Sequence, residues 1–443
     1  NMNLREEKIM DKMADVLGRA GAWCGQNKYL SAIKNAFQNF MPLTIAGAIG
    51  VLWCNVLVNE STGLGIFFKP IMALEFLNPA FQAVNFCTIS CITVGITLGI
   101  AQEIGVWNMG AEKAGYIPGL VGLAAWLSVT NTSHMVEGAK EAFTGIAGNE
   151  LGATGLFTGM IIGVLSVELF CFFEKQDALK IKMPEQVPPG VARAFEVLVP
   201  ATITLIITAC IGSACYNLTG LYLNDVIKNG IQGPLGAVGA TIPGVMIIYL
   251  VIMLFWLVGI HGNNMLSAVK EALFTPLALE NVEAFNKGET PKNIINMYFL
   301  QMCGEFGGSG VTIGLVIAIM IFGKREDNKA IATLSLVPGL FNINETVTFG
   351  IPMVLNPILG IPFVFACLVT ILVGYVLTVI GFCPVACLTV PWTTPPIVFG
   401  FLACGANVMG AVTQAILIVV STVIYVPFLI AYEKYQNKQA AEA

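Results

Sequence analysis

The sequence has little charge and almost no histidine. Aspartate, glutamate, lysine and arginine together make up 11% of its 443 residues, and there are two histidines. Apolar residues make up 56%, and the mean hydropathy is +0.78. A membrane-spanning helix needs about 20 mostly apolar residues, and about ten segments meet or approach that length. The low charge therefore excludes a soluble domain and indicates a polytopic membrane protein.

Several sequence patterns are also missing. No series of short alternating strands recurs, which excludes an outer-membrane barrel and leaves an all-α bundle. No Gly-x-x-x-x-Gly-Lys-Ser/Thr motif occurs, so ATP binding by that motif is excluded. None of the twelve cysteines forms a C-x-x-C pair, which argues against a zinc or redox site and favours small buried side chains. We expect no metal and no cofactor. The charged N-terminus lacks the pattern of a signal peptide.

The basic residues gather in four places. They lie before or within the first apolar segment (5–34), between the fourth and fifth segments (175–193), at 324–329 and at 434–438. The loops at 59–80, 132–150 and 217–241 hold one lysine each. The positive-inside rule then places both termini and the 175–193 loop in the cytoplasm.

The chain divides near its middle. Residues 1–216 hold about five apolar segments and are expected to form a scaffold, and residues 217–241 form an amphipathic, glycine-rich connector. Residues 242–443 are dense in proline and glycine, as in transporters whose helices open around a site at mid-membrane depth. Within this half, 262–330 mixes apolar and polar pieces shorter than a span, which predicts re-entrant or broken helices. The second half is therefore the expected transport domain.

Two short polar islands interrupt this apolar half. The first is Gly259-Ile260-His261-Gly262-Asn263-Asn264, directly after a long apolar helix. The second is Phe341-Asn342-Ile343-Asn344-Glu345-Thr346, between apolar flanks. Ionisable groups at membrane depth are costly and mark substrate or ion paths. His261 could instead be a helix-end histidine satisfied by carbonyls, and Glu345 an exposed loop carboxylate, but the surroundings favour a site. In an extended tip, Asn342 and Asn344 would share one side.

Three further residues are candidates for the same site. Glu305 lies in a segment with four glycines in seven residues, where the backbone can approach a ligand closely; a plain hairpin tip is the alternative. Trp256 lies five residues before His261, and Trp392 lies among prolines and threonines. Tryptophans often belong to interfacial belts, but a flat amphipathic ring beside amides also suits a sugar face.

The candidate residues offer an imidazole, carboxylates, carboxamides and indoles, without a cluster of buried arginine or lysine. An anionic substrate would need such cations, whereas carboxylates and carboxamides pair well with hydroxyl groups. A neutral polyol, hence a sugar, fits best. An ion-coupled sugar symporter is the main alternative, because buried glutamate and histidine also relay protons. A passive channel is the third possibility.

The two islands together carry a resemblance. Gly-Ile-His-Gly-Asn-Asn at 259–264 followed by Asn-Ile-Asn-Glu at 342–345 is similar to the membrane component, EIIC, of the bacterial phosphoenolpyruvate-dependent sugar phosphotransferase system. The likeness is to its lactose/cellobiose/chitobiose family, with the diacetylchitobiose-specific members most similar. It covers essentially the whole chain, and the motifs do not separate chitobiose from cellobiose permeases.

This resemblance implies a fold of ten transmembrane helices and two re-entrant hairpins, and a homodimer in the lipid bilayer joined through the N-terminal half. The C-terminal half holds a β-linked disaccharide, with His261 and Glu345 near the C6 hydroxyl that becomes phosphorylated. The phosphate comes from a phosphocysteine of a IIB subunit on a separate polypeptide. No nucleic-acid partner is implied. The expected contacts to the sugar are Trp256, Gly262, Asn263, Asn264, Glu305, Asn342, Asn344 and Trp392.

Overall fold

The computed structural model describes residues 26–442 apart from 61–64, 66–67, 135–142, 185, 352 and 355, and before them residues 16, 17, 19, 20, 22 and 23. Most of the charged N-terminal segment therefore lies outside the described residues. The described chain is almost entirely helical, as predicted. Its two strands, β1 (Ser133–His134) and β2 (Phe143–Thr144), pair antiparallel with Ser133 opposite Thr144.

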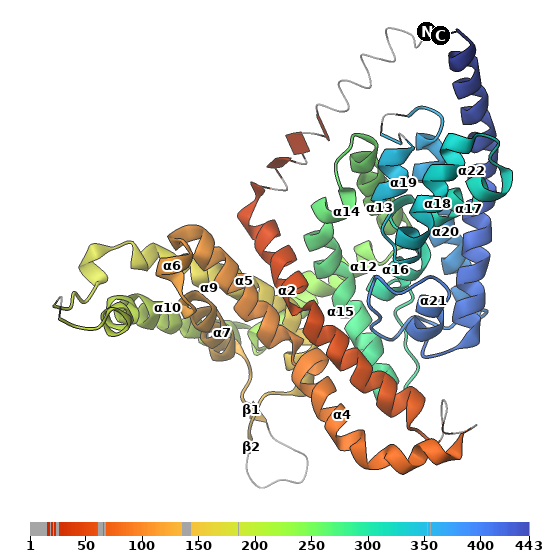
Figure 1. The fold of residues 1–443 in the computed structure, drawn as a ribbon. Coiled ribbons are helices and arrows are strands. Elements are labelled where there is room, and N and C mark those ends of the chain that lie inside the picture. Colours follow the sequence, from red (N-terminus) through yellow and green to blue (C-terminus); the bar gives the residue numbers. More distant parts are fainter. Residues whose placement is uncertain are drawn as a thin grey trace.

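The first half of the chain forms one side of the molecule (Figure 1). Its long helices are apolar along most of their length, as a membrane interior requires. In chain order its helices are α2 (Lys28–Leu52) with the π-helical turn η1 (Trp53–Leu57), η2 (Lys69–Leu77), α4 (Asn78–Asn85), η3 (Phe86–Ser90), α5 (Ile92–Met109), α6 (Ala111–Ala114), α7 (Ile117–Val129), α8 (Gly148–Leu151), α9 (Ala153–Glu174), η4 (Asp177–Leu179) and α10 (Pro189–Thr219).

Small residues let the helices of this half approach closely. A Cβ added at Gly159 of α9 would lie 2.2 Å from the Oγ1 atom of Thr97 in α5. A Cβ added at Gly122 of α7 would lie 2.3 Å from the Cβ of Ala101, also in α5. Helices packed in a bilayer gain their stability from such close backbone contact. The trio α5, α7 and α9 is therefore a tightly packed unit.

Charges at one end of this unit are paired. Glu174, the last residue of α9, is buried and accepts from Lys113 at 2.8 Å and from Arg193 at 3.0 Å. Glu168 lies 2.6 Å from Lys28 of α2. The basic residues of this end therefore neutralise carboxylates near the helix termini.

The connector is helical, and the second half forms the other side of the molecule (Figure 1). The connector holds α11 (Leu223–Ile227), η5 (Lys228–Gln232) and α12 (Gly233–Gly239). The second half holds α13 (Ile242–Leu257), α14 (Gly262–Met265), α15 (Ser267–Asn286), α16 (Met297–Gly304), η6 (Ser309–Val311), α17 (Ile313–Phe322), α18 (Glu326–Leu340), α19 (Glu345–Gly350), α20 (Gly360–Val379), α21 (Val398–Ala403) and α22 (Val408–Glu442). Helix α15 packs against α2 and α9 and so joins the two halves.

Fewer helices qualify as complete spans than the sequence predicts. Five described helices are long and apolar enough to cross a membrane, or seven if each of two bent pairs counts as one span. The second pair joins Met297–Val311 to Ile313–Phe322 at an angle of 59°, as a broken span or a re-entrant loop would. The structure therefore supports an all-α membrane protein, and the expectation of ten helices with two re-entrant hairpins is not confirmed.

Candidate functional site

The first polar island turns the chain between α13 and α14. Gly259 adopts a φ of +79°, which favours glycine. The chain then folds back so closely that a Cβ at Gly262 would lie 2.0 Å from the carbonyl oxygen of Ile252 in α13. The glycine at 262 therefore allows this backbone approach, and the predicted contact of Gly262 with the sugar stays a prediction. His261 sits at the apex and begins the short helix α14 as its N-cap.

The N-cap contact fixes the imidazole of His261. Its Nδ1 atom accepts a hydrogen bond of 3.3 Å from the backbone N–H of Asn264. A neutral imidazole that accepts at Nδ1 carries its proton on Nε2. This Nε2 atom lies 3.8 Å from Oε1 of Glu345 in the second island. The two side chains are 38% and 46% exposed, so each can be reached from outside the protein.

Trp256 lies behind the imidazole. Its ring centroid is 4.4 Å from that of His261 and 6.4 Å from that of Phe363, which it meets in an edge-to-face arrangement. The indole is buried, and its Nε1 atom has no hydrogen-bond partner among the described residues. In this conformation Trp256 therefore supports His261 from the protein side. Its predicted stacking on a sugar stays a prediction.

The second island is a turn between α18 and α19. Asn342 has a φ of +63°, and Glu345 is the first residue of α19, whose N-cap is Asn344. The expectation of an extended tip is therefore wrong, because the left-handed residue reverses the chain at once. The carboxamides of Asn342 and Asn344 nevertheless reach the same loop, residues 305–309.

The 305–309 loop ties the two islands together. The backbone N–H of Gly307 donates to Oδ1 of Asn342 at 2.6 Å. The carboxamide of Asn344 donates to the carbonyl of Ser309 at 3.0 Å, and that of Asn263 donates to the Ser309 hydroxyl at 3.0 Å. Three of the predicted site residues thus converge on one loop, although they are far apart in sequence.

Glycine is required in this loop for space as well as conformation. Gly308 has a φ of +88°, and a Cβ there would lie 2.6 Å from the Cβ of Asn344. A side chain at this position would push the second island away from the loop. The glycine-rich sequence noted around Glu305 therefore serves contact between protein segments.

Glu305 is held by two residues. The hydroxyl of Tyr249 donates to Oε1 of Glu305 at 2.7 Å, and the ammonium of Lys270 contacts the same oxygen. The pattern analysis missed Lys270, which is buried in α15. The sequence does hold a signal for this residue, because Lys270 lies in a segment flanked by apolar helices. A charge buried at that depth is expected to have a partner of opposite charge. The pair carries no net charge, so the expectation of a neutral substrate is unaffected.

Trp392 and Asn264 complete the predicted set. The carboxamide of Asn342 donates to the carbonyls of Trp392 and Thr394, at 2.5 and 3.0 Å, and so brings the 391–396 segment to the second island. The indole of Trp392 is 44% exposed and is free to meet a ligand face. The side chain of Asn264 is exposed and lines a small hollow between α2 and the start of α15. Within the described ranges, no three histidine, cysteine, aspartate or glutamate residues gather where they could hold a metal ion.

Asn342 is the junction of this arrangement, and its replacement by alanine should destabilise the protein. The change removes one acceptor and two donor contacts, and alanine tolerates a left-handed φ poorly. We expect a loss of about 2–4 kcal/mol, from the unpaired backbone groups and the strain together. Thermal unfolding in detergent measures it.

Asn342→Gly separates the two causes, because glycine adopts the conformation without strain but makes none of the contacts. It should be about 1 kcal/mol more stable than Asn342→Ala. Equal stability of Asn342→Ala and the wild-type protein would show that the carboxamide does not hold the segments together.

Comparisons with known proteins agree on one family. The family model described as "Phosphotransferase system, EIIC" matches residues 34–367. The oligo-beta-mannoside-specific EIIC component of Bacillus subtilis is 34% identical over 97% of this chain and 94% of its own length. The cellobiose-specific EIIC component of Lactococcus lactis is 29% identical over 96% of this chain and 98% of its own. The crystal structure of ChbC, the IIC component from an N,N'-diacetylchitobiose-specific phosphotransferase system, superposes with a TM-score of 0.86 at 29% identity, over 95% of this chain and 97% of that one.

Proposed function

Because the chain belongs to the EIIC family of the phosphotransferase system, and is a membrane permease for β-linked sugars, we propose that it translocates a β-linked disaccharide and presents the C6 hydroxyl of that sugar to a phosphorylated IIB protein. The resemblance of the islands ranks diacetylchitobiose first and cellobiose second. The names of the relatives cover both, together with β-mannosides.

One observation carries the proposed chemistry: the gap between Nε2 of His261 and Oε1 of Glu345. At 3.8 Å the two atoms are too far apart for a hydrogen bond to each other. A hydroxyl oxygen placed beside both atoms can accept from the Nε2–H of His261 and donate its own proton to the Glu345 carboxylate. The pair is therefore suited to bind and orient one hydroxyl group.

The tautomer of His261 indicates which of the two residues, His261 or Glu345, acts as the base. With Nδ1 occupied by the Asn264 N–H and the proton on Nε2, a neutral His261 has no free lone pair to act as a base. Glu345 then accepts the proton of the C6 hydroxyl as its oxygen attacks the phosphorus of phosphocysteine. The O–P bond forms, the S–P bond breaks, and the thiolate of IIB leaves. Phosphoryl transfer depends mainly on such positioning and charge stabilisation.

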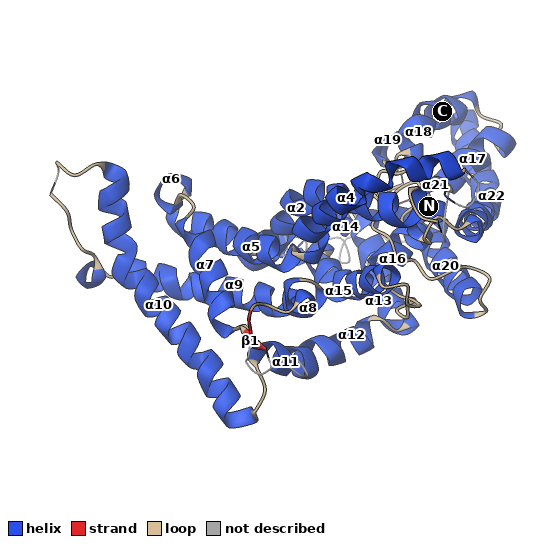
Figure 2. Cartoon of the chain, turned by 90° about the horizontal axis from the view of Figure 1, so that it is seen from below, coloured by secondary structure: helices blue, strands red, loops and turns tan. Residues whose placement is uncertain are grey.

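The wider assembly follows the family resemblance. We propose ten transmembrane helices with two re-entrant hairpins, both termini in the cytoplasm of a bacterial cell, and a homodimer formed by the N-terminal half. The basic clusters near 324–329 and 434–438 support the orientation. The position of α10 supports the dimer, because it lies at the edge of the first half, away from the second (Figure 2), and exposes Leu198, Ile206 and Ile211.

Equilibrium binding of labelled cellobiose and labelled diacetylchitobiose to the purified protein in detergent tests this function. We expect saturable binding of at least one of them without sodium or a pH gradient, competition by other β-linked disaccharides, and weak competition by monosaccharides. The preparation should have the mass of two chains by light scattering.

Failure of a folded dimer to bind any β-linked disaccharide would contradict the proposal. The buried Lys270–Glu305 pair gives the alternative, an ion-coupled sugar transporter, a specific candidate for a proton relay. Binding that requires a sodium ion or changes with an imposed proton gradient would favour that alternative.

A further inference from the structure

The pair Lys270–Glu305 lies beside the site but has no part in the proposed phosphoryl transfer. The two side chains are 8% and 18% exposed, so the pair is almost withdrawn from water. Burying an ion pair costs desolvation energy that close contact only partly offsets, and buried pairs are therefore weak evidence for stability. This ion pair is therefore expected to serve a function beyond stabilising the fold.

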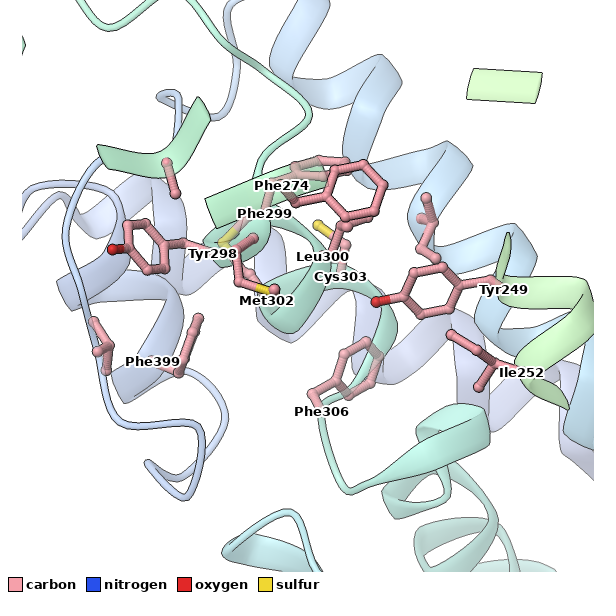
Figure 3. Packing of buried hydrophobic residues seen from close by; sticks show 14 of the residues in the cluster. Tyr249, Ile252, Phe274, Tyr298, Phe299, Leu300, Met302, Cys303, Phe306 and Phe399 are labelled. Carbon is pink, nitrogen blue, oxygen red and sulfur yellow. The ribbon is translucent and has the colours of Figure 1, made fainter. Parts of the chain in front are cut away.

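Both partners bind the same oxygen of Glu305. Tyr249 donates to Oε1, and Lys270 contacts Oε1. Figure 3 shows the hydroxyl of Tyr249 pointing from α13 toward the end of α16, where Phe306 follows. No residue in the described part of the chain donates to the second oxygen, Oε2. Because Oε2 has no such partner and is not fully buried, it is accessible to a ligand. Glu305 is thus held rigidly by one oxygen and offers the other.

Glu305 opens the loop that both polar islands bind. Gly307 and Ser309 of this loop are hydrogen-bonded to Asn342, Asn344 and Asn263, which belong to the two islands that hold His261 and Glu345. The free oxygen of Glu305 therefore belongs to the same site as the pair proposed to orient the C6 hydroxyl. A carboxylate oxygen has two lone pairs and can accept from two hydroxyl groups.

We propose that Lys270 is a positioning residue for sugar recognition: its ammonium holds Glu305 as an oriented carboxylate whose free Oε2 accepts hydrogen bonds from ring hydroxyls of the bound disaccharide. This inference rests on the proposed function and deepens it. Hydrogen bonds to an ionised acceptor are stronger than those to a neutral one. The ammonium of Lys270 favours the ionised form of the Glu305 carboxyl although that group is largely buried. The pair remains neutral overall, which matches an uncharged sugar.

The test is a double-mutant cycle on disaccharide binding. Glu305→Gln and Lys270→Met should each lower the affinity for the tighter-binding of cellobiose and diacetylchitobiose by about tenfold or more, the loss expected for a charge-assisted hydrogen bond. The double variant should bind within about twofold of Glu305→Gln, because Lys270 acts only through Glu305. Residues with independent effects would instead add.

A second readout distinguishes positioning from support of the fold. In the wild-type protein, at least one monodeoxy derivative of the same disaccharide should bind about tenfold more weakly than the parent sugar. In Glu305→Gln and in Lys270→Met the same derivative should lose little relative to the parent. Glu174→Gln is the matched control, because it neutralises a buried, paired glutamate in the first half and should leave affinity unchanged.

The outcomes separate this inference from the proposed function. If the folded wild-type protein binds no β-linked disaccharide, the proposed function fails, and the inference with it. If the wild-type protein binds and Lys270→Met or Glu305→Gln binds equally well, only the role of the pair fails. Additive losses in the double variant would also overturn it. Should Lys270→Met alone fail to fold, because it leaves a buried carboxylate unpaired, the double variant and Glu305→Gln must still show the same affinity and the same insensitivity to the missing hydroxyl.

Discussion

Replacing Glu345 with glutamine is expected to lower the rate of sugar phosphorylation by about 10²–10⁴-fold, the usual contribution of a general base. Glutamine fills the same space at the start of α19 and can still accept a hydrogen bond from the C6 hydroxyl, but it cannot take the proton. Sugar binding should therefore change by much less than the rate. The measurement is sugar phosphate formation in membrane vesicles supplied with phosphoenolpyruvate and the soluble phosphotransferase proteins, beside equilibrium binding to purified protein.

The control for this variant is Glu326→Gln. Glu326 begins α18, is well exposed and, within the described part of the chain, pairs only with Lys329, 3.2 Å away on the same helix. It offers a glutamate near Glu345 in sequence but outside the site, so both binding and phosphorylation should match the wild-type protein. A Glu345→Gln protein that phosphorylates sugar within about twofold of the wild-type rate would exclude a catalytic role for Glu345.

The polar islands could be located from the sequence because of their contrast with the chain around them. An imidazole and a carboxylate in segments this apolar have few structural uses. In the structure, Nε2 of His261 and Oε1 of Glu345 lie 3.8 Å apart. It also shows why Asn342 and Asn344 accompany Glu345: their carboxamides hold the 305–309 loop.

Other features depend on long-range packing and could not be predicted. A lysine between apolar helices predicts a carboxylate partner for Lys270, but nothing local identifies Glu305 as that partner. Trp256 and Trp392 looked alike, yet one is buried behind His261 and the other is exposed. The left-handed conformation of Asn342 is likewise stabilised by three hydrogen bonds to distant backbone groups. It makes this segment a turn and not an extended tip.

The helix count shows a related limit. Hydropathy predicts continuous spans, whereas η3 interrupts the path into α5. The 59° bend between α16 and α17 lies within 262–330, where broken or re-entrant helices were predicted. Breaks of this kind put backbone groups where protein can satisfy them. The Gly307 N–H and the Ser309 carbonyl, both bound by asparagines of the second island, are examples. The features that obscured the helix count are thus the ones that build the site.

Replacing His261 with alanine should weaken both the binding of the disaccharide and its phosphorylation. The change removes the Nε2–H proposed to donate to the C6 hydroxyl, removes the N-cap of α14 and uncovers the ring of Trp256. We expect the affinity for the disaccharide to fall about tenfold, as for the loss of one hydrogen bond in a polar site, and phosphorylation to fall further because the hydroxyl is no longer oriented. Binding and vesicle phosphorylation measure the two effects separately.

His261→Asn distinguishes recognition from capping. Asparagine is among the best N-cap residues, so this variant should regain the roughly 1 kcal/mol that alanine loses at the start of α14. Its side chain is shorter and does not extend to the gap beside Glu345, so it should remain as defective as His261→Ala in phosphorylation. If His261→Asn instead restored phosphorylation together with thermal stability, the role of His261 would be to shape the turn, and Glu345 would have to orient the hydroxyl without it.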